Sequence, residues 1–162
     1  MSTPAISPSG FSLSAPNAEE RKRLEADLSR DEADVLLHHG TEAPFCGGLL
    51  DQKDSGVYCC RLCGLPLVQH KTKFESGTGW PSFWAPVDEA HVTAVRDTSY
   101  GMLRIETRCA RCDSHQGHVF PDGPPPTRLR YCINSVSLEF VADGAELRDP
   151  LAREDNTAKT HA

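Results

Sequence analysis

Long apolar runs and blocks of basic residues are both missing from this sequence, and each absence excludes a class of protein. No stretch approaches the roughly 18 apolar residues of a membrane-spanning helix. The formal net charge is −6 and the pI is about 5.6, so an electrostatic footprint for nucleic acid is missing. The N-terminus also lacks the charged start and apolar centre of a secretory signal. We expect a soluble, cytoplasmic protein that binds neither membrane nor nucleic acid.

The 162 residues suffice for one domain with a sizeable hydrophobic core. Residues 1–18 are rich in Ser, Pro and Ala and are expected to form a flexible tail, and the polar residues 149–162 a second one. A single domain over residues 19–148 remains. No internal repeat of domain scale is present, and no feature demands more than a monomer.

Helix signals are confined to the N-terminal part of this domain. Residues 19–28 are charged and predict a short helix, and Ser29 with Glu32 forms a capping box before a second helix that Gly40 would end. From Val57 onward, short apolar runs separated by Gly and Pro indicate antiparallel strands. The sequence therefore predicts a mainly β protein of the α+β class.

Residues 130–140 alternate between apolar and polar side chains and predict one half-buried strand. Successive side chains of a strand point to opposite faces, so Cys132 and Asn134 would share a face with the apolar residues that follow them. This pattern places a thiol at the rim of the core with an amide beside it. From this stretch alone, a buried structural role for Cys132 is as well supported as a reactive one.

Four of the seven cysteines form two Cys-x-x-Cys pairs, Cys60 with Cys63 and Cys109 with Cys112. Without a secretion signal, this pattern favours metal ligands over disulfides. Two residues between the cysteines let both sulfurs face one ion, and two pairs complete the tetrahedral shell of a Zn²⁺. Cys59 could replace Cys60, but its spacing to Cys63 matches the second pair less well. Four protein ligands leave no open position for substrate, so we expect a structural zinc.

Cys46, Cys59 and Cys132 remain outside the expected metal site. His115 and His118 closely follow the second cysteine pair, so a metal-pinned loop would position two imidazoles. A nucleophilic cysteine needs thiolate character and a nearby acid or base, and histidine is the usual one near neutral pH. Alone, each histidine would more simply be a surface or structural residue. Together with a cysteine at the rim of the core, the pair favours catalysis.

Three motifs follow one another along the chain: Gly79-Trp80-Pro81-Ser82-Phe83, then Arg108-Cys109-x-x-Cys112-x-x-His115-x-Gly117-His118-Val119-Phe120, then Arg130-Tyr131-Cys132-x-Asn134-Ser135. Together they resemble the motifs of the methionine-R-sulfoxide reductase family, the MsrB type. The resemblance extends over residues 28–141. It implies a compact fold of two small antiparallel sheets with N-terminal helices and a structural zinc site.

The resemblance also implies roles for individual residues. Cys132 matches the nucleophile that attacks the sulfoxide sulfur and becomes a sulfenic acid. His118, with His115 beside it, matches the pair that positions and protonates the departing oxygen. Asn134 matches the amide that orients the substrate.

Three further residues match the substrate pocket of that family. Trp80 and Phe83 match the aromatic wall around the methyl group of the sulfoxide, and an apolar wall suits a methyl thioether. Arg130 is expected to favour formation of the thiolate. Without the resemblance, ordinary core packing would be a competing explanation for both aromatic residues.

The sequence departs from the family at one position. Many members carry a resolving cysteine just before the Gly-Trp-Pro-Ser-Phe motif, where this chain has Thr78. We expect Cys46 to take this role, by attacking the Cys132 sulfenic acid to form a disulfide that thioredoxin reduces. Cys59 is a second candidate, and direct reduction of the sulfenic acid by a small reductant is a third route.

The leading hypothesis is therefore an enzyme that reduces the R epimer of methionine sulfoxide in oxidised proteins or peptides, with the free amino acid as an open second substrate. The alternative is a zinc-stapled β-domain that binds a small molecule or peptide without catalysis. A zinc-ribbon module for nucleic acid is disfavoured by the acidic charge balance.

Overall fold

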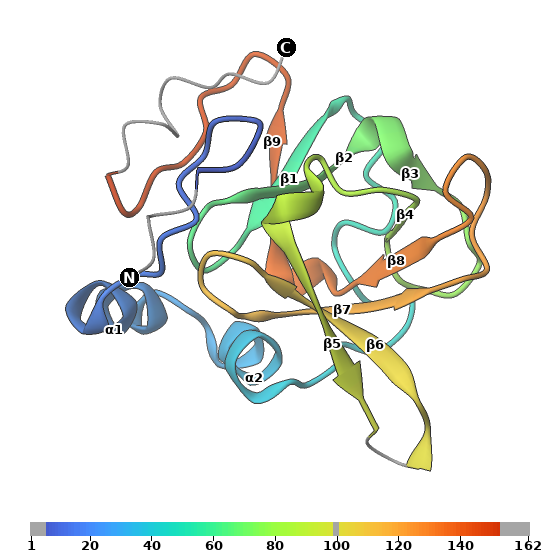
Figure 1. Ribbon diagram of the computed structural model, residues 1–162, viewed down its shortest axis with the longest axis horizontal. Coiled ribbons are helices and arrows are strands. Elements are labelled where there is room, and N and C mark those ends of the chain that lie inside the picture. Colours follow the sequence, from blue (N-terminus) through green and yellow to red (C-terminus); the bar gives the residue numbers. More distant parts are fainter. Residues whose placement is uncertain (1–5, 99–100, 153–162) are drawn as a thin grey trace.

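Two antiparallel β-sheets and two α-helices make up the fold of this computed structural model, which describes residues 6–98 and 101–152 (Figure 1). The smaller sheet has the order β2-β1-β9, with strands Pro66–Gln69, Gly56–Cys60 and Leu138–Ala142. The larger sheet has the order β3-β4-β8-β7-β6-β5, with strands Lys73–Phe74, Ser82–Phe83, Arg130–Ile133, His115–Phe120, Arg104–Cys109 and Val92–Asp97. The expected mainly β fold with two small sheets is confirmed.

Helices α1 (Ala18–Ala26) and α2 (Arg30–His38) both precede the first strand, as predicted. The capping box of Ser29 and Glu32 is present at the start of α2. At the end of α2, His39 rather than Gly40 takes the left-handed conformation, with φ 59°. None of the helices among the described residues is long and apolar enough to cross a membrane.

Residues 130–140 do not form the single strand that their alternating pattern predicted. β8 ends at Ile133, the 3-10 turn η4 (Ser135–Ser137) follows, and the chain continues as β9 in the other sheet. Buried serines explain the interruption, because their hydroxyls bond to loop and strand backbone. Ser137 donates to the His115 carbonyl (3.0 Å), and Ser135 accepts from the Leu49 amide (3.3 Å). Cys132 therefore does not share one strand face with the apolar residues of β9.

The core between the sheets is built around Tyr58 of β1. Its ring contacts Phe83 of β4 and Phe140 of β9, with ring centroids 5.1 Å and 5.0 Å apart. Strands β1 and β2 are buried along almost their whole length, which explains why their sequence is apolar without alternation.

The described part of the N-terminal segment packs onto this core. Phe11 is buried against the His91 ring, which belongs to the 3-10 turn η2 (Glu89–His91). Nε2 of His91 also lies 2.8 Å from the Ser7 hydroxyl. The outer parts of the two expected tails, residues 1–5 and 153–162, lie outside the described residues.

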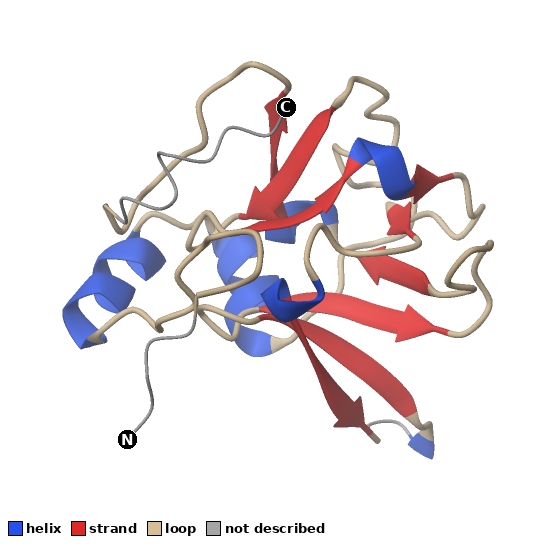
Figure 2. Cartoon of the chain, turned by 45° about the horizontal axis from the view of Figure 1, so that its top comes forward, coloured by secondary structure: helices blue, strands red, loops and turns tan. Residues whose placement is uncertain are grey.

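The β5–β6 hairpin extends beyond the rest of the fold (Figure 2). Its pairing runs from Val92 with Cys109 to Asp97 with Arg104. β6 also pairs with β7, with a register shift between Thr107 and Arg108. This register decides which carboxylates of the hairpin reach the histidines of β7.

Candidate active site and metal centre

Four buried cysteines gather into a cluster that could hold a metal ion, and they are the four that the sequence predicts. Their sulfurs all lie within 4.8 Å of one another. The Cys60–Cys112 and Cys63–Cys109 sulfur pairs are 3.6 Å and 3.5 Å apart. Four sulfurs about 2.3 Å from a tetrahedral zinc lie roughly 3.8 Å apart, so the cluster fits this ion. Cys59 is not part of the cluster.

The two cysteine pairs have the same local geometry. The amide of Gly64 donates to the Cys60 carbonyl (2.8 Å), and the amide of Asp113 donates to the Cys109 carbonyl (2.8 Å). Gly64 and Asp113 both have positive φ, which closes each turn after its second sulfur. A side chain on Gly64 would also meet the backbone oxygen of Arg148 at 2.9 Å.

Polar groups around the cluster face its sulfurs and backbone. The Gln116 amide donates to the Cys60 sulfur (3.6 Å), and the Ser114 hydroxyl lies 3.3 Å from the same sulfur. Arg111 is fully buried and donates to the Cys63 carbonyl (3.3 Å). A buried guanidinium beside four sulfurs offsets the negative charge of a thiolate-bound metal.

One face of the larger sheet brings together residues that the sequence motifs singled out. Cys132 of β8 lies directly opposite His118 of β7, and His118 lies directly opposite Glu106 of β6. Opposite residues on antiparallel strands place their side chains on the same face. Arg130 shares this face because it lies two positions before Cys132 on β8.

A cavity of about 280 Å³ opens on this face. Seven of its lining residues belong to the recognised motifs, namely Trp80, Gly117, His118, Phe120, Arg130, Cys132 and Asn134. Thr78 and Arg104 also line it. The volume is close to the lower end of the usual range for small-ligand sites, roughly 300 Å³, and is suited to one side chain.

The Cys132 sulfur is partly buried in this cavity, and burial raises the pKa of its thiol. The Arg130 guanidinium and the Thr78 hydroxyl both contact the sulfur and oppose the shift, while the nearby Glu42 carboxylate adds to it. The pKa stays above its ordinary value, so the resting group is mainly a neutral thiol at neutral pH.

The Arg130 guanidinium is held on two sides. Its Nε and one terminal nitrogen donate to the two carboxylate oxygens of Asp122 (2.9 and 3.1 Å), and the group lies 4.3 Å from the centre of the Phe120 ring. This arrangement fixes a positive charge beside Cys132.

His118 is oriented by a carboxylate from the β5–β6 hairpin. Its Nε2 lies 2.8 Å from Oδ2 of Asp97, and Arg104 approaches the same oxygen (3.4 Å). Because a carboxylate only accepts hydrogen bonds, Nε2 of His118 is the donor. In the neutral ring, the other nitrogen, Nδ1, is therefore the unprotonated one.

His115 lies behind His118, with ring centroids 5.6 Å apart, and does not line the cavity. Its Nδ1 donates to Oε2 of the buried Glu106 (2.6 Å), while Nε2 is buried without a partner among the described residues. Burial lowers the pKa of His115, although Glu106 opposes this shift, so the ring is neutral at neutral pH.

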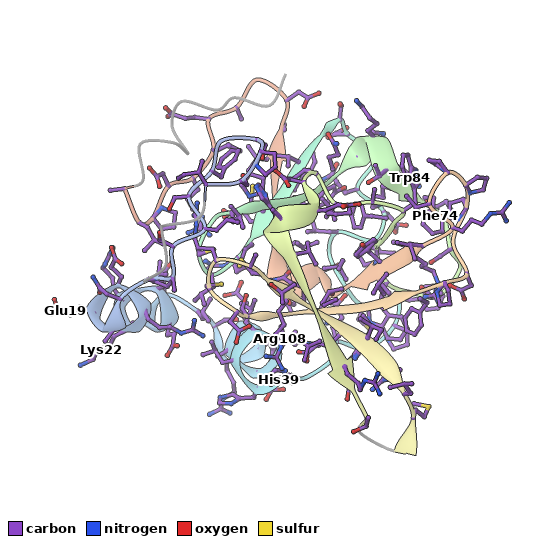
Figure 3. The ribbon with its side chains drawn as sticks, viewed as in Figure 1. Glu19, Lys22, His39, Phe74, Trp84 and Arg108 are labelled. Atoms are coloured by element: carbon purple, nitrogen blue, oxygen red, sulfur yellow. The ribbon has the colours of Figure 1, made fainter. Side chains whose placement is uncertain are left out.

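Glu106 is the centre of a wider network. In addition to the bond from His115, its carboxylate accepts hydrogen bonds from Nδ1 of His39 (2.7 Å) and from the Arg108 guanidinium (2.9 Å). The side chains of His39 and Arg108 are labelled in Figure 3 and lie near each other there. Burial disfavours the ionised form of Glu106 and raises its pKa. The three hydrogen-bond donors outweigh this effect and lower the pKa of Glu106 to about 2. The His39, Glu106 and His115 group could also hold a metal, but the Arg108 cation beside it disfavours one.

Asn134 and Trp80 are tied to the loop that precedes β1. Oδ1 of Asn134 accepts from the Glu42 amide (3.0 Å), its Nδ2 donates to the Gln116 carbonyl (3.1 Å), and Nε1 of Trp80 donates to the Glu42 carbonyl (3.0 Å). These bonds hold the indole at the cavity wall. They also show that both polar atoms of the buried Asn134 amide are bonded to backbone groups.

Phe83 is not brought into the cavity. The register pairs Ser82 with Cys132 and Phe83 with Tyr131, so Phe83 points to the opposite face and packs in the core against Tyr58. The second aromatic wall is instead Phe120, at the end of β7.

The two candidate resolving cysteines differ in exposure. Cys46 is exposed, in a loop whose Gly47 packs against Ser135 and Glu42. Cys59 is buried in β1 of the other sheet, and burial raises the pKa of its thiol to about 12. An exposed thiol reacts and a buried, protonated one does not, which favours Cys46.

The structure is a mainly β protein with a cluster of four cysteines that could hold a metal ion and a cavity lined by Cys132 and His118. A family profile described as the SelR domain matches residues 28–142. The chain is 75% identical over 150 residues to the peptide methionine sulfoxide reductase MsrB of Caulobacter vibrioides strain NA1000 / CB15N, covering 93% of this chain and 94% of the relative. Against the protein of the same name from Xylella fastidiosa strain 9a5c, identity is 57% over 148 residues, with 91% and 96% covered. The chain therefore belongs to the SelR domain family, and the resemblance to MsrB proteins is confirmed.

Proposed function

We propose that this protein reduces the R epimer of methionine sulfoxide in peptides to methionine, with Cys132 as the nucleophile. The observation that carries the proposal is the pairing of Cys132 with His118 on adjacent strands, inside a cavity walled by Trp80 and Phe120. The relatives named peptide methionine sulfoxide reductase MsrB support reduction of methionine sulfoxide in peptides.

In the first half-reaction, the Cys132 sulfur attacks the sulfoxide sulfur and the sulfur–oxygen bond of the substrate breaks. The oxygen is transferred to Cys132, which is oxidised to a sulfenic acid, while the substrate is reduced to the thioether. The thiol proton ends on the transferred oxygen, so the step needs no other reactant. Arg130 stabilises the thiolate that forms as the proton leaves the sulfur.

His118 is the side chain that contacts the sulfoxide oxygen of the substrate. Asp97 holds its Nε2–H, so Nδ1 passes the proton from the thiol to the oxygen. His115 acts through His118, since it is buried behind that ring. Glu106 and Asp97 are positioning residues, because each holds one imidazole without lining the cavity.

The shape of the cavity supports selectivity for one epimer. Trp80 and Phe120 are apolar walls for the methyl group, while His118 and Arg130 lie where the oxygen must be. Sulfoxide sulfur is a stereocentre, so only one epimer presents its methyl group to the first pair and its oxygen to the second while its sulfur faces Cys132.

In the second half-reaction, the Cys46 thiol attacks the Cys132 sulfenic acid, a disulfide forms and water leaves. Thioredoxin then reduces this disulfide. The exposure of Cys46 and the contact of its loop with Ser135 support this role. Thr78 occupies the position of the resolving cysteine found in many family members, and its hydroxyl contacts the Cys132 sulfur without being able to form a disulfide.

Zinc is the proposed occupant of the tetracysteine cluster, and when bound it supplies a cross-link between distant segments. The cluster joins the turn after β1 to the turn between β6 and β7. It thereby fixes the strand that carries His115 and His118. A monomeric state and a cytoplasmic location stay predictions.

The test is reduction of separate R and S epimers of a methionine sulfoxide peptide, with dithiothreitol and then with thioredoxin. The proposal expects turnover of the R epimer alone with both reductants, and loss of only the thioredoxin route in Cys46→Ser. Thioredoxin-dependent activity retained in Cys46→Ser would reassign the resolving step. No turnover by folded, zinc-loaded protein would leave a binding module.

A further inference from the structure

A second cavity, of about 310 Å³, adjoins the catalytic one. Its apolar lining consists of Phe45, Leu50, Phe74, Trp80 and Pro81, and Trp80 lines both cavities. The Cys132 mechanism uses none of these residues except Trp80. Phe74 marks the position of this second cavity in Figure 3, at the side of the molecule away from the helices.

Phe45 is the unusual residue of this second cavity. Phe45 is 68% exposed, and its backbone has φ 65°, a left-handed conformation that is unfavourable for a non-glycine residue. The Phe45 amide donates to the Gly79 carbonyl (2.7 Å), which fixes this conformation. A Cβ on Gly79 would lie 2.9 Å from the Phe45 ring, so the aromatic ring rests directly on the glycine. An aromatic side chain held in this way toward solvent points to recognition.

The charged groups of the second cavity lie at its rim. The Lys73 ammonium is occupied, because it donates to the Leu50 and Gln52 carbonyls (2.7 and 3.0 Å). Asp51 and Glu75 are exposed, and Glu75 pairs with Lys53 on the surface. The five apolar side chains of the lining offer contact surface for an apolar group, and the exposed Asp51 carboxylate disfavours an acidic one.

We propose that this second cavity binds the side chain of an apolar residue near the sulfoxide in a polypeptide substrate, so that the protein prefers peptides with such a residue over peptides without one. The inference rests on the proposed function, since it assigns a neighbour to the sulfoxide already in the catalytic cavity. In an extended peptide, side chains two positions apart point the same way, roughly 7 Å apart. With the sulfoxide on one side of Trp80, the side chain two positions away enters the cavity on the other side.

The experiment compares kcat/KM, with dithiothreitol as reductant, for free methionine R-sulfoxide and for sulfoxide pentapeptides. The peptides carry Phe, Gly or Asp two positions before or two positions after the sulfoxide. For the wild type we expect kcat/KM to be highest with Phe, lower with Gly and lowest with Asp at one of these positions. The difference between Phe and Gly should be about tenfold and should come from a lower KM for the Phe peptide.

The variants are Phe45→Ala and Phe74→Ala, and Ile6→Ala is the control. Ile6 is also an exposed apolar residue, but it belongs to the N-terminal segment, where it forms an isolated β-bridge with Ser12, and it does not line the cavity. Phe45→Ala and Phe74→Ala should each remove most of the preference for Phe and leave turnover of the free sulfoxide unchanged. Ile6→Ala should change neither quantity.

Three outcomes would overturn the inference. The first is a wild type that turns over all peptides equally, and the second is an equal loss on free and peptide substrates in Phe45→Ala. The third emerges from a parallel assay with thioredoxin as reductant: a Phe45→Ala or Phe74→Ala variant whose only defect is a raised KM for thioredoxin would make the cavity a docking site for the reductant. Absence of turnover of any sulfoxide by the wild type would instead refute the proposed function itself.

Discussion

Cys132 and His118 lie directly opposite each other on the antiparallel strands β8 and β7, and both line the same cavity. A strand ladder is a rigid way to hold a nucleophile beside a proton carrier, because backbone bonds on both sides fix the two Cα positions. The neighbouring strands extend this arrangement, since Glu106 on β6 and Asp97 on β5 each hold one histidine.

The bond between Asp97 and His118 predicts the effect of Asp97→Asn. We expect kcat to fall about 100-fold, because His118 loses the carboxylate that selects its tautomer. Nitrogen-15 NMR of the histidine rings should show Nε2 of His118 protonated in the wild type and a mixture of tautomers in the variant. Arg96→Ala is the matched control, since Arg96 precedes Asp97 on β5 and is exposed. An unchanged tautomer and kcat in Asp97→Asn would contradict this role.

Glu106 predicts a pH dependence of stability. Its pKa is lowered to about 2 in the folded protein, below an ordinary value of 4.5, so the ionised form stabilises the fold. This contribution is complete above about pH 4.5 and is lost as the pH falls toward 2. Glu106→Gln should be less stable at neutral pH and lose less stability over this acid window. The measurement is the free energy of unfolding of both proteins by chemical denaturation from pH 6 to pH 2. Acid also releases metal from the four cysteines, but this loss is common to both proteins and cancels in the difference between their free energies. Parallel curves would refute it.

Arg130 predicts a change in the reactivity of Cys132. Burial raises the pKa of this thiol and the guanidinium holds it down, so Arg130→Met should raise it further. Alkylation by iodoacetamide, resolved by mass spectrometry at each cysteine, should become slower at Cys132 at pH 7 and reach its plateau at higher pH. Exposed Cys46 is an internal control and should react at the same rate in both proteins. Equal pH profiles for Cys132 would show that Arg130 does not favour the thiolate.

The metal cluster predicts different effects for different cysteines. Cys109→Ser should lose bound zinc and more than about 3 kcal/mol of stability, because a buried metal cross-link is removed. Cys132→Ser should keep its zinc and its thermal unfolding temperature while losing activity. Metal analysis and calorimetry of both variants test this separation. Zinc retained in Cys109→Ser would remove that residue from the ligand set.

The parts of the structure that local spacing determines could be predicted from the sequence. The four metal-cluster cysteines follow from the two Cys-x-x-Cys pairs, and the start of α2 follows from Ser29 and Glu32. Each pair and the helix start depend on residues within one turn, and the shared chemistry of the two pairs predicts that they meet at one ion.

The parts that depend on strand register could not be predicted. Phe83 was expected in the substrate pocket, but its pairing with Tyr131 turns it to the core, and Phe120 is the wall instead. Asp97 and Glu106 were missed because their relation to the histidines depends on how β5, β6 and β7 align, including the shift at Thr107. Alternation is a signal of a strand but not of its partners.

The break after Ile133 has a similar origin. The pattern of residues 130–140 fits one strand, and the bonds that interrupt it are made by Ser135 and Ser137 to Leu49 and His115, far away in the sequence. Side chains that bond to distant backbone leave no local signal in a sequence.

The most direct test of the account is a single turnover without any reductant. Wild-type protein is mixed with an excess of the R epimer of a methionine sulfoxide peptide, and the methionine product and the state of each cysteine are measured. The account predicts one methionine per protein molecule, a Cys46–Cys132 disulfide, and no product from the S epimer. No product from either epimer, by folded and zinc-loaded protein, would contradict it.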